Sequence, residues 1–193
     1  MKKKIVLASI VALSLALVVA VGVTVAYLFV KTDSVVNTFE PSNIEVTLTE
    51  TTGTSYKMIP GTTLAKNPTV TVVNDIDCYV FIKVEKTNDP DKYLDYSIIT
   101  GDTEWKALDG YGDVYYRVVG KDDAIKTFSI LTNNQVTVKN SVTKEMMNAL
   151  YNTDGSFKTA SLPELTFTAY AVQSDNVADA AAAWNIAIGA TNP

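Results

Sequence analysis

The sequence predicts a mainly β protein: a jelly-roll-like β-sandwich with two short packing helices, preceded by an N-terminal signal-peptide helix. Apolar and polar residues alternate with a period of two along several runs, and turn formers such as Pro60-Gly61 and Asp109-Gly110 separate these runs. Residues 1–26 have the pattern of an export signal. The 193 residues therefore divide into a signal peptide (1–26), an N-terminal segment (27–39) and a single β-sandwich domain (40–193).

The export signal begins with the basic residues Lys2–Lys4 and continues with the apolar run Ile5–Val23. Thr24 and Ala26 give the small-x-small pattern that signal peptidases cleave, so we expect cleavage between Ala26 and Tyr27. The alternative is a permanent signal anchor, because the apolar run is about long enough to span a bilayer. We expect a secreted, extracellular protein, which meets a membrane only through the uncleaved signal.

Side-chain alternation predicts where the strands of the domain lie, since every second residue of a half-buried strand faces the core. The inward positions expected in chain order are Ile44, Val46 and Leu48; Val70 and Val72; Cys78, Val80, Ile82 and Val84; and Leu165, Phe167, Ala169 and Ala171, with Thr166, Thr168 and Tyr170 on the opposite face. The turn formers in Asp109–Asp113 predict a hairpin between strands within Glu104–Leu108 and Val114–Val119.

Two segments repeat apolar residues with helical spacing. The first is Ser141–Tyr151, with Val142, Met146 and Leu150 on one face and Asn140 or Ser141 as N-cap. The second is Val177–Ile188, whose apolar stripe is Val177, Ala181, Trp184 and Ile188. Asp175 or Asn176 is its expected N-cap, Asp179 lies in its first turn, and Gly189 follows its end. We interpret both as helices that pack on the sheets; a groove that binds a partner is the alternative.

Composition excludes several classes of function. The net charge is −5, and removal of the signal lysines makes the remainder more acidic, so we expect no nucleic-acid partner. The chain has no histidine, which excludes Ser-His-Asp and Cys-His catalysis and every zinc site that needs His. Cys78 is the one cysteine, lies in an apolar run and is interpreted as a buried structural thiol. We expect no enzyme, no catalytic residue and no cofactor.

One acidic loop is the candidate for a metal site made of oxygen ligands. It contains Asn88, Asp89, Asp91 and Asp95, but it lacks the central Gly and the final Glu of an EF-hand. A solvated loop that binds no metal is the interpretation we favour, and calcium binding is the alternative.

One group of aromatic residues is the candidate for a sugar-binding surface. Trp105, Tyr111, Tyr115 and Tyr116 lie in or beside the expected hairpin. Aromatic rings on paired strands pack against each other across the strands, and we favour that interpretation over an exposed patch.

The N-terminal segment is the candidate assembly strand. Tyr27, Leu28, Phe29 and Val30, followed by Val35 and Val36, are apolar, β-prone residues at the terminus that cleavage would create. A strand that joins an open sheet edge satisfies backbone groups on both sides. The segment is therefore expected either to pair with another copy of the chain or to be the first strand of its own domain.

Several stretches resemble a known family when they are taken in order. They are the apolar run ending in Ala26-Tyr27-Leu28-Phe29, then Thr32–Phe39, Ile44–Leu48, Met58-Ile59-Pro60-Gly61, Val72-Val73-Asn74, Tyr79–Val84, Thr168–Gln173 and Ala183-Trp184. Over nearly its whole length the chain resembles the TasA/camelysin (CalY) family of secreted biofilm matrix proteins of Gram-positive bacteria. The signal peptides of that family are removed by a dedicated SipW-type signal peptidase.

The resemblance implies a jelly-roll subunit that polymerises with itself, and with other matrix proteins, into extracellular fibres. In such fibres the segment freed by signal cleavage inserts as a strand into the next subunit, and a SipW-type signal peptidase is the processing partner. Camelysin itself is classed as a metallopeptidase, but this sequence departs from that by having no histidine and no recognisable zinc set. A cell-surface metallopeptidase and a surface adhesin or carbohydrate-binding module are the alternative functions.

Overall fold

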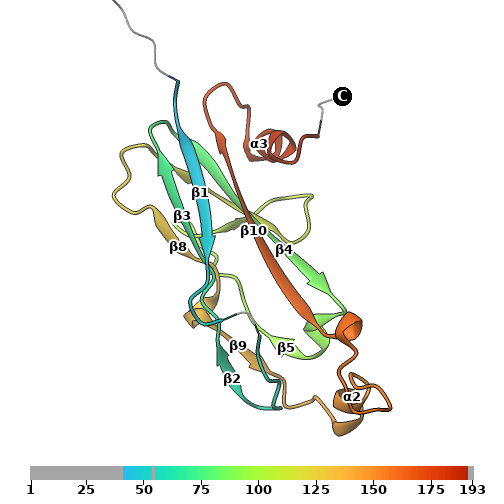
Figure 1. The fold of residues 1–193 in the computed structure, drawn as a ribbon. Coiled ribbons are helices and arrows are strands. Elements are labelled where there is room, and N and C mark those ends of the chain that lie inside the picture. The colour runs from blue at the N-terminus through green and yellow to red at the C-terminus, as the bar shows by residue number, and fades with distance from the viewer. Residues whose placement is uncertain (1–40, 54, 191–193) are drawn as a thin grey trace, which may run out of the picture. The chain divides into compact units, whose positions relative to one another are not determined.

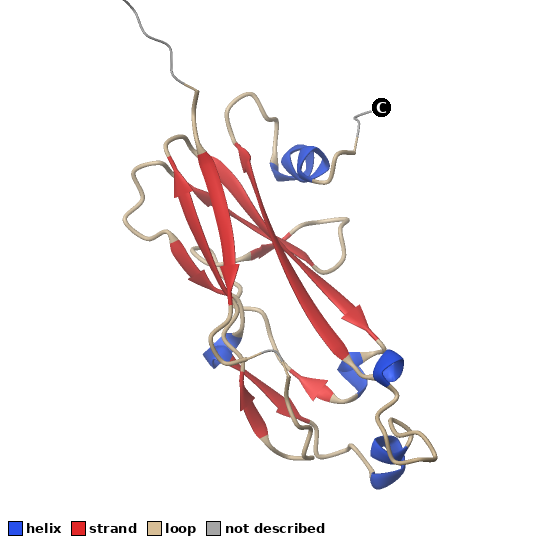
Figure 2. Cartoon of the chain, viewed as in Figure 1, coloured by secondary structure: helices blue, strands red, loops and turns tan. Residues whose placement is uncertain are grey.

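The computed structural model describes residues 41–53 and 55–190, and this part of the chain is mainly β (Figure 1). The chain divides into two units, Met1–Glu40 and Pro41–Pro193, and the fold described here belongs to the second. Strands dominate it and helices are short (Figure 2). Within the described ranges, no helix is both long enough and apolar enough to cross a membrane.

The strands form three antiparallel sheets. The first contains β1 (Ile44–Thr49), β3 (Thr69–Asn74) and β8 (Thr127–Ser129), in the order β1-β3-β8. The second contains β10 (Glu164–Gln173), β4 (Cys78–Thr87), β7 (Val114–Val119) and β6 (Lys106–Ala107), in that order. The third contains β2 (Thr63–Ala65), β9 (Gln135–Val138) and β5 (Leu94–Asp95), in that order.

Five short helices complete the described fold. Two are α-helical, α2 (Lys144–Asn148) and α3 (Ala180–Ala187). Three are 3-10 helices, η1 (Pro90–Lys92), η2 (Thr132–Asn134) and η3 (Thr159–Ser161). The expectation of a mainly β chain with two short helices is confirmed.

The main core lies between the first and second sheets. Side chains of β3 and β8 contact side chains of β4 and β7 there, and the contributing buried residues are Val70, Val72, Cys78, Val80, Ile82, Trp105, Val119, Phe128 and Ile130. Ile44, Val46 and Leu48 of β1 and Phe167, Ala169 and Ala171 of β10 pack against this core from the two edges. The expected alternation is therefore confirmed in all four strands, and Cys78 is a buried free thiol.

The outer face of the second sheet is covered by α3 (Figure 1). Trp184 is only 3% exposed and its ring lies 5.4 Å from the Phe81 ring and 5.1 Å from the Tyr170 ring. Ala180 and Ala183 are buried beside it. An eight-residue helix is too short to be stable in isolation, so this packing is what holds α3 in place.

Both α-helices are shorter than the sequence predicts, and their caps differ. The first begins after Thr143, whose side-chain oxygen accepts a hydrogen bond from Met146 N, so Asn140 and Ser141 are not its caps. The second begins after Asp179, whose carboxylate accepts from Ala182 N at 2.8 Å. Periodicity cannot separate a helix from the turns that precede it when those turns carry apolar residues at similar spacing.

The apolar stripe assigned to the second helix is partly wrong. Val177 precedes α3 but still packs against the same buried cluster as Trp184, whereas Ile188 follows the helix and is half-exposed. Gly189 ends the helix as expected, with a φ of 68° that suits glycine and with its N–H donating to the Ile186 carbonyl.

The hairpin expected around Asp109–Asp113 is confirmed, because β6 pairs with β7 there, with Ala107 opposite Tyr115.

A third core lies among β5, β9 and α2, with Tyr93, Val138, Val142 and Leu150 buried in it. The expected apolar face of the first helix packs into this core.

Candidate functional site

The strand β10 is the outermost strand of the second sheet, and it forms a ladder with β4 on one side only. It has ten residues and is the longest edge strand in the described sheets. On its other side β1 lies close by, but no ladder joins the two strands (Figure 1). Long edges with unpaired backbone groups are normally covered or shortened in soluble proteins, because they template pairing with other chains. The edge of β10, which no ladder pairs and which faces β1, is therefore the first element of the candidate site.

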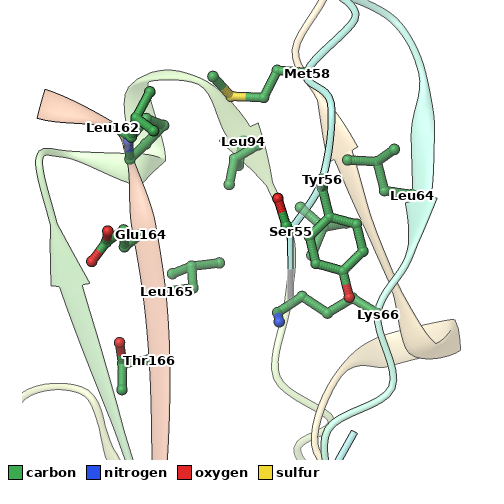
Figure 3. Close-up of a pocket in the computed structure, with 12 residues that line it drawn as sticks. Ser55, Tyr56, Met58, Leu64, Lys66, Leu94, Leu162, Glu164, Leu165 and Thr166 are labelled. Carbon is green, nitrogen blue, oxygen red and sulfur yellow. The ribbon is translucent and has the colours of Figure 1, made fainter. Parts of the chain in front are cut away.

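A groove of about 430 Å³ lies beside the first half of β10, and we call it the seam groove (Figure 3). Its lining residues are Ser55, Tyr56, Met58, Leu64, Lys66, Leu94, Val136, Leu162, Pro163, Glu164, Leu165 and Thr166. They come from four places in the sequence: the segment around β2, the strand β5, the strand β9 and the start of β10. The volume lies within the range of about 300–1,000 Å³ that binding clefts occupy.

The floor of the seam groove is apolar. Met58, Leu64, Leu94 and Leu162 line it and at the same time pack against the third core, which fixes their positions. Leu165 points into the groove from β10, whereas Glu164 points away from it (Figure 3). A partner that fills this groove would bury apolar surface, at roughly 25 cal/mol for each Å².

The end of the groove nearest the main core is polar. The Lys66 Nζ lies 2.8 Å from Glu50 Oε2, and both side chains are nearly buried, at 12% and 15% exposed. The Tyr56 hydroxyl donates to Glu50 Oε1 at 2.8 Å, and the Lys66 ammonium lies 5.3 Å from the Tyr56 ring and 5.6 Å from the Phe167 ring. Burial raises the pKa of the Tyr56 phenol, and Glu50 adds to the shift. This cluster ties the segment at Glu50–Tyr56 to β10.

Chemically, this arrangement suits an extended peptide. An open strand edge offers backbone donors and acceptors, and an apolar channel beside it offers space for alternate side chains, which together are the elements of strand addition. No group of three or more His, Cys, Asp or Glu side chains in the described ranges could hold a metal ion.

The residues proposed from the sequence for signal cleavage and assembly lie outside the described residues. These are Thr24 and Ala26 with Tyr27, and the assembly strand residues Tyr27, Leu28, Phe29, Val30, Val35 and Val36. They stay predictions.

The acidic loop is held by its own hydrogen bonds and ion pairs. Asp91 accepts from the Tyr96 hydroxyl at 2.8 Å and lies 3.1 Å from Lys86 Nζ, and these two groups lower the pKa of its carboxyl. The Asn88 amide donates to the carbonyls of Ala160 and Leu162, so its role is to connect two loops. The ion pair and hydrogen bonds give the loop a structural role.

The aromatic group does not form a surface patch. Trp105 is fully buried in the main core and its Nε1 donates to the Ser129 carbonyl at 2.9 Å, so its ring cannot stack on a sugar at the surface. Tyr116 packs against Phe81 on the neighbouring strand, with ring centroids 6.3 Å apart. Cross-strand aromatic packing is therefore present, but it joins Tyr116 of β7 to Phe81 and Tyr79 of β4 and not to the other strand of the hairpin.

Sequence reasoning missed the seam groove. Its walls lie far apart in the chain and meet only when β2 and β9 pair and β10 closes the second sheet. One local signal was available: Pro163 stands directly before β10, and proline in a sheet favours the start of a strand or an edge.

No family model, no curated protein and no solved structure matches this chain.

Proposed function

We propose that this chain is a secreted, non-enzymatic structural subunit of extracellular matrix fibres. In this proposal the segment Tyr27–Phe39 of one copy pairs as a strand with the β10 edge of a neighbouring copy and places side chains in the seam groove. The partners are further copies of the chain and other matrix proteins, and a SipW-type signal peptidase frees the segment. The observation that carries the proposal is the edge of β10, which no ladder pairs, with an apolar groove beside its first residues.

The chemistry of the segment fits such a groove. In an extended strand, Leu28 and Val30 share one face, with Tyr27 and Phe29 on the other. One face would enter a channel lined by residues such as Met58 and Leu165. The added strand would also satisfy backbone groups at the start of β10, beside the seam groove, since each unpaired N–H or C=O that is removed from water costs free energy.

The proposal includes a finer description of the fold, a jelly-roll-like β-sandwich. Its support is the main core enclosed by the first and second sheets and the unclosed seam between β1 and β10. In a closed sandwich this seam would be bridged by a further strand, and the incoming segment would supply one.

The alternatives are a cell-surface metallopeptidase and an adhesin or carbohydrate-binding module. The first lacks support because the sequence offers no histidine ligand or base, and its one cysteine is buried. The second loses its strongest residue, because the Trp105 ring lies in the core.

Electron microscopy of protein purified from the medium of a secreting host tests the proposal. We expect fibres from the parent chain and none after deletion of Tyr27–Asn37, with the deleted protein still folded by circular dichroism. Leu28→Pro removes one backbone donor and should prevent fibres, whereas Leu28→Ile keeps the donor and should not. Fibres from the deleted protein would contradict the donor strand, and a deleted protein that cannot fold would assign the segment to its own domain.

A pair of substitutions on β10 tests the acceptor side. Leu165→Asp places a charge in the seam groove and should stop fibre growth, because an unpaired charge is costly to bury. Thr168→Asp, on the opposite face of the same strand, is the control and should leave fibres intact. Equal behaviour of the two variants would remove the seam groove from the proposal.

A further inference from the structure

A second hollow lies between β7 of the second sheet and β8 of the first, and we call it the Arg117 hollow. It has a volume of about 650 Å³, and its lining comes from the loop before β6, from β7, from β8 and from the loop that joins β7 to β8. The strands β8 and β1 are opposite edges of the first sheet. The described residues that line the Arg117 hollow also differ from those that line the seam groove, so the two are separate sites.

Arg117 is the only arginine of the chain, and its side chain is held in one position. The guanidinium carbon lies 3.6 Å from the centre of the Phe128 ring and 5.3 Å from that of the Trp105 ring. Its Nη2 donates to the Thr103 carbonyl at 2.6 Å, and the side chain is only 12% exposed. A guanidinium that is already stacked and hydrogen-bonded loses little further freedom when it binds a ligand.

The guanidinium has N–H groups that the described part of the chain does not use. Arginine carries five N–H donors, and the Thr103 carbonyl accepts from one of them. The ion-pair partner Glu104 places Oε2 3.9 Å from Nη1, which is too far for a hydrogen bond. Every buried polar side-chain atom of the described residues has a partner, so the nitrogens of Arg117 that lack one are accessible to solvent.

The hydration that Arg117 has lost is only partly replaced by its neighbours. Burial lowers the pKa of the guanidinium, and the nearby carboxylates of Glu104 and Asp123 oppose this shift without cancelling it. An anion that accepts hydrogen bonds from the free N–H groups would therefore stabilise the charged side chain further.

Apolar side chains surround the free donors. Ile125 is 69% exposed, Val118 is also exposed, and both line the hollow together with Ile99. The Phe128 ring lies beneath the guanidinium. A ligand that covers these side chains would bury apolar surface beside the charge.

The shape and the charge of the hollow select one class of anion. The planar guanidinium fork matches the two oxygens of a carboxylate. Asp123 and Glu104 line the same hollow, so a dianion such as a phosphate monoester would meet more repulsion than a singly charged carboxylate. The Asp123 carboxylate accepts from Gly120 N at 2.8 Å, whereas Glu104 is exposed and without a hydrogen bond to Arg117, so an incoming carboxylate would displace Glu104.

We propose that the Arg117 hollow binds an organic monocarboxylate that carries an apolar tail. The carboxylate binds the free N–H groups of Arg117, and the tail covers Val118 and Ile125. A free alkyl or aryl acid and the C-terminus of an apolar peptide share this chemistry. The inference goes beyond the proposed function and does not depend on it, because the seam groove takes no part.

Saturation-transfer difference NMR with 4-phenylbutyrate tests the inference on protein purified from the medium of a secreting host. The method observes the ligand, so it works on monomers and on fibres. We expect saturable binding of 4-phenylbutyrate. The neutral 4-phenylbutanamide should bind at least about tenfold more weakly, because it cannot form charge-assisted hydrogen bonds. Acetate should also bind more weakly, because it has no tail. Equal binding of the acid and the amide, or no saturable binding of the acid, would overturn the inference.

Variants separate binding from a purely structural role of Arg117 on the Phe128 ring. Glu104→Gln removes the competing carboxylate and should tighten binding of 4-phenylbutyrate several-fold, whereas a structural arginine predicts no change. Ile125→Asn should weaken binding, and Ile186→Asn, an exposed isoleucine of α3, is the control that should not. The replaced side chains are exposed, so all three variants should fold. Unchanged affinity in both Glu104→Gln and Ile125→Asn would overturn the site.

Arg117→Lys keeps the charge but loses the planar fork. It should weaken binding of 4-phenylbutyrate by about tenfold or more while circular dichroism stays that of the parent chain. Full affinity in a folded Arg117→Lys variant would overturn the role of the fork.

Competition with acetyl-leucyl-leucine distinguishes the two sources of the carboxylate. Tighter binding of this peptide than of 4-phenylbutyrate would support the C-terminus of a peptide as the ligand. Tighter binding of 4-phenylbutyrate would support a free acid. Failure of the peptide and the free acid to displace each other would show that they occupy different places and would overturn the single site.

Discussion

Replacing Trp184 by alanine should detach α3 from the second sheet. The ring is 3% exposed and packs between Phe81 and Tyr170, with the Tyr170 contact edge-to-face at 87°. Burial of a Trp side chain removes on the order of 200 Å² from water, which at roughly 25 cal/mol for each Å² is worth about 5 kcal/mol. Measured Trp→Ala losses in cores are about 3–5 kcal/mol, so the two figures agree.

The loss acts first on the helix, because α3 has only Ala180, Ala183 and Trp184 buried to hold it. We expect a free energy of unfolding about 3–5 kcal/mol below that of the parent chain, measured by urea denaturation with the buried Trp105 as the fluorescent reporter. Hydrogen exchange should show lost protection in α3 before β4. Ile186→Ala, on the exposed side of the same helix, is the control and should cost less than about 0.5 kcal/mol. Equal costs for the two substitutions would refute the assigned packing.

Two further predictions concern the core thiol and the ion pair at the groove. Burial raises the pKa of Cys78 from 9.0 to about 11, so a thiol reagent at pH 8 should label the unfolded chain but not the folded one. Between these pKa values the unfolded chain loses the thiol proton and the folded chain keeps it, so this group makes the free energy of unfolding fall as pH rises from about 9 to about 11. Rapid labelling of folded protein would contradict this. Glu50→Gln should lower the free energy of unfolding by about 1–3 kcal/mol, because it leaves the nearly buried Lys66 without its anion. Glu85→Gln, in the exposed pair with Lys83, is the control and should change that free energy by less than about 0.5 kcal/mol. Similar losses for the two variants in urea denaturation would show that burial of the first pair contributes nothing.

The strand positions of this fold could be read from the sequence because each depends on local alternation. Val70 and Val72, for example, face the main core whatever the partner strand is, since the period of two alone sets the face. The hairpin between β6 and β7 could be read for a similar reason, as its turn and both strands are contiguous.

The helix boundaries were harder to predict. Asp175, Asn176 and Asp179 are all good N-caps by residue type, and only the position of Trp184 over Phe81 selects Asp179. The cap is therefore decided by tertiary packing, which local sequence does not contain.

The seam groove could not be predicted at all, because its lining depends on contacts between distant segments. Lys66 reaches Glu50 and Phe167 only after three sheets have formed. Its residues have no shared motif, spacing or composition that would mark them as neighbours in the linear sequence.

The pairing of β10 with β4 has a consequence for the timing of folding if the chain is exported, as the proposed function requires. Gln173 pairs with Cys78, so β4 gains its second partner strand only when residues near the end of the described chain are available. Long-range pairings of this kind form slowly, because the entropy cost of closing the intervening loop comes before any stabilising contact. Under the proposed function, a chain that is still crossing the membrane would therefore not yet have a β10 edge. Such incomplete chains could not accept a strand from a growing fibre, and only fully translocated copies would be added to it.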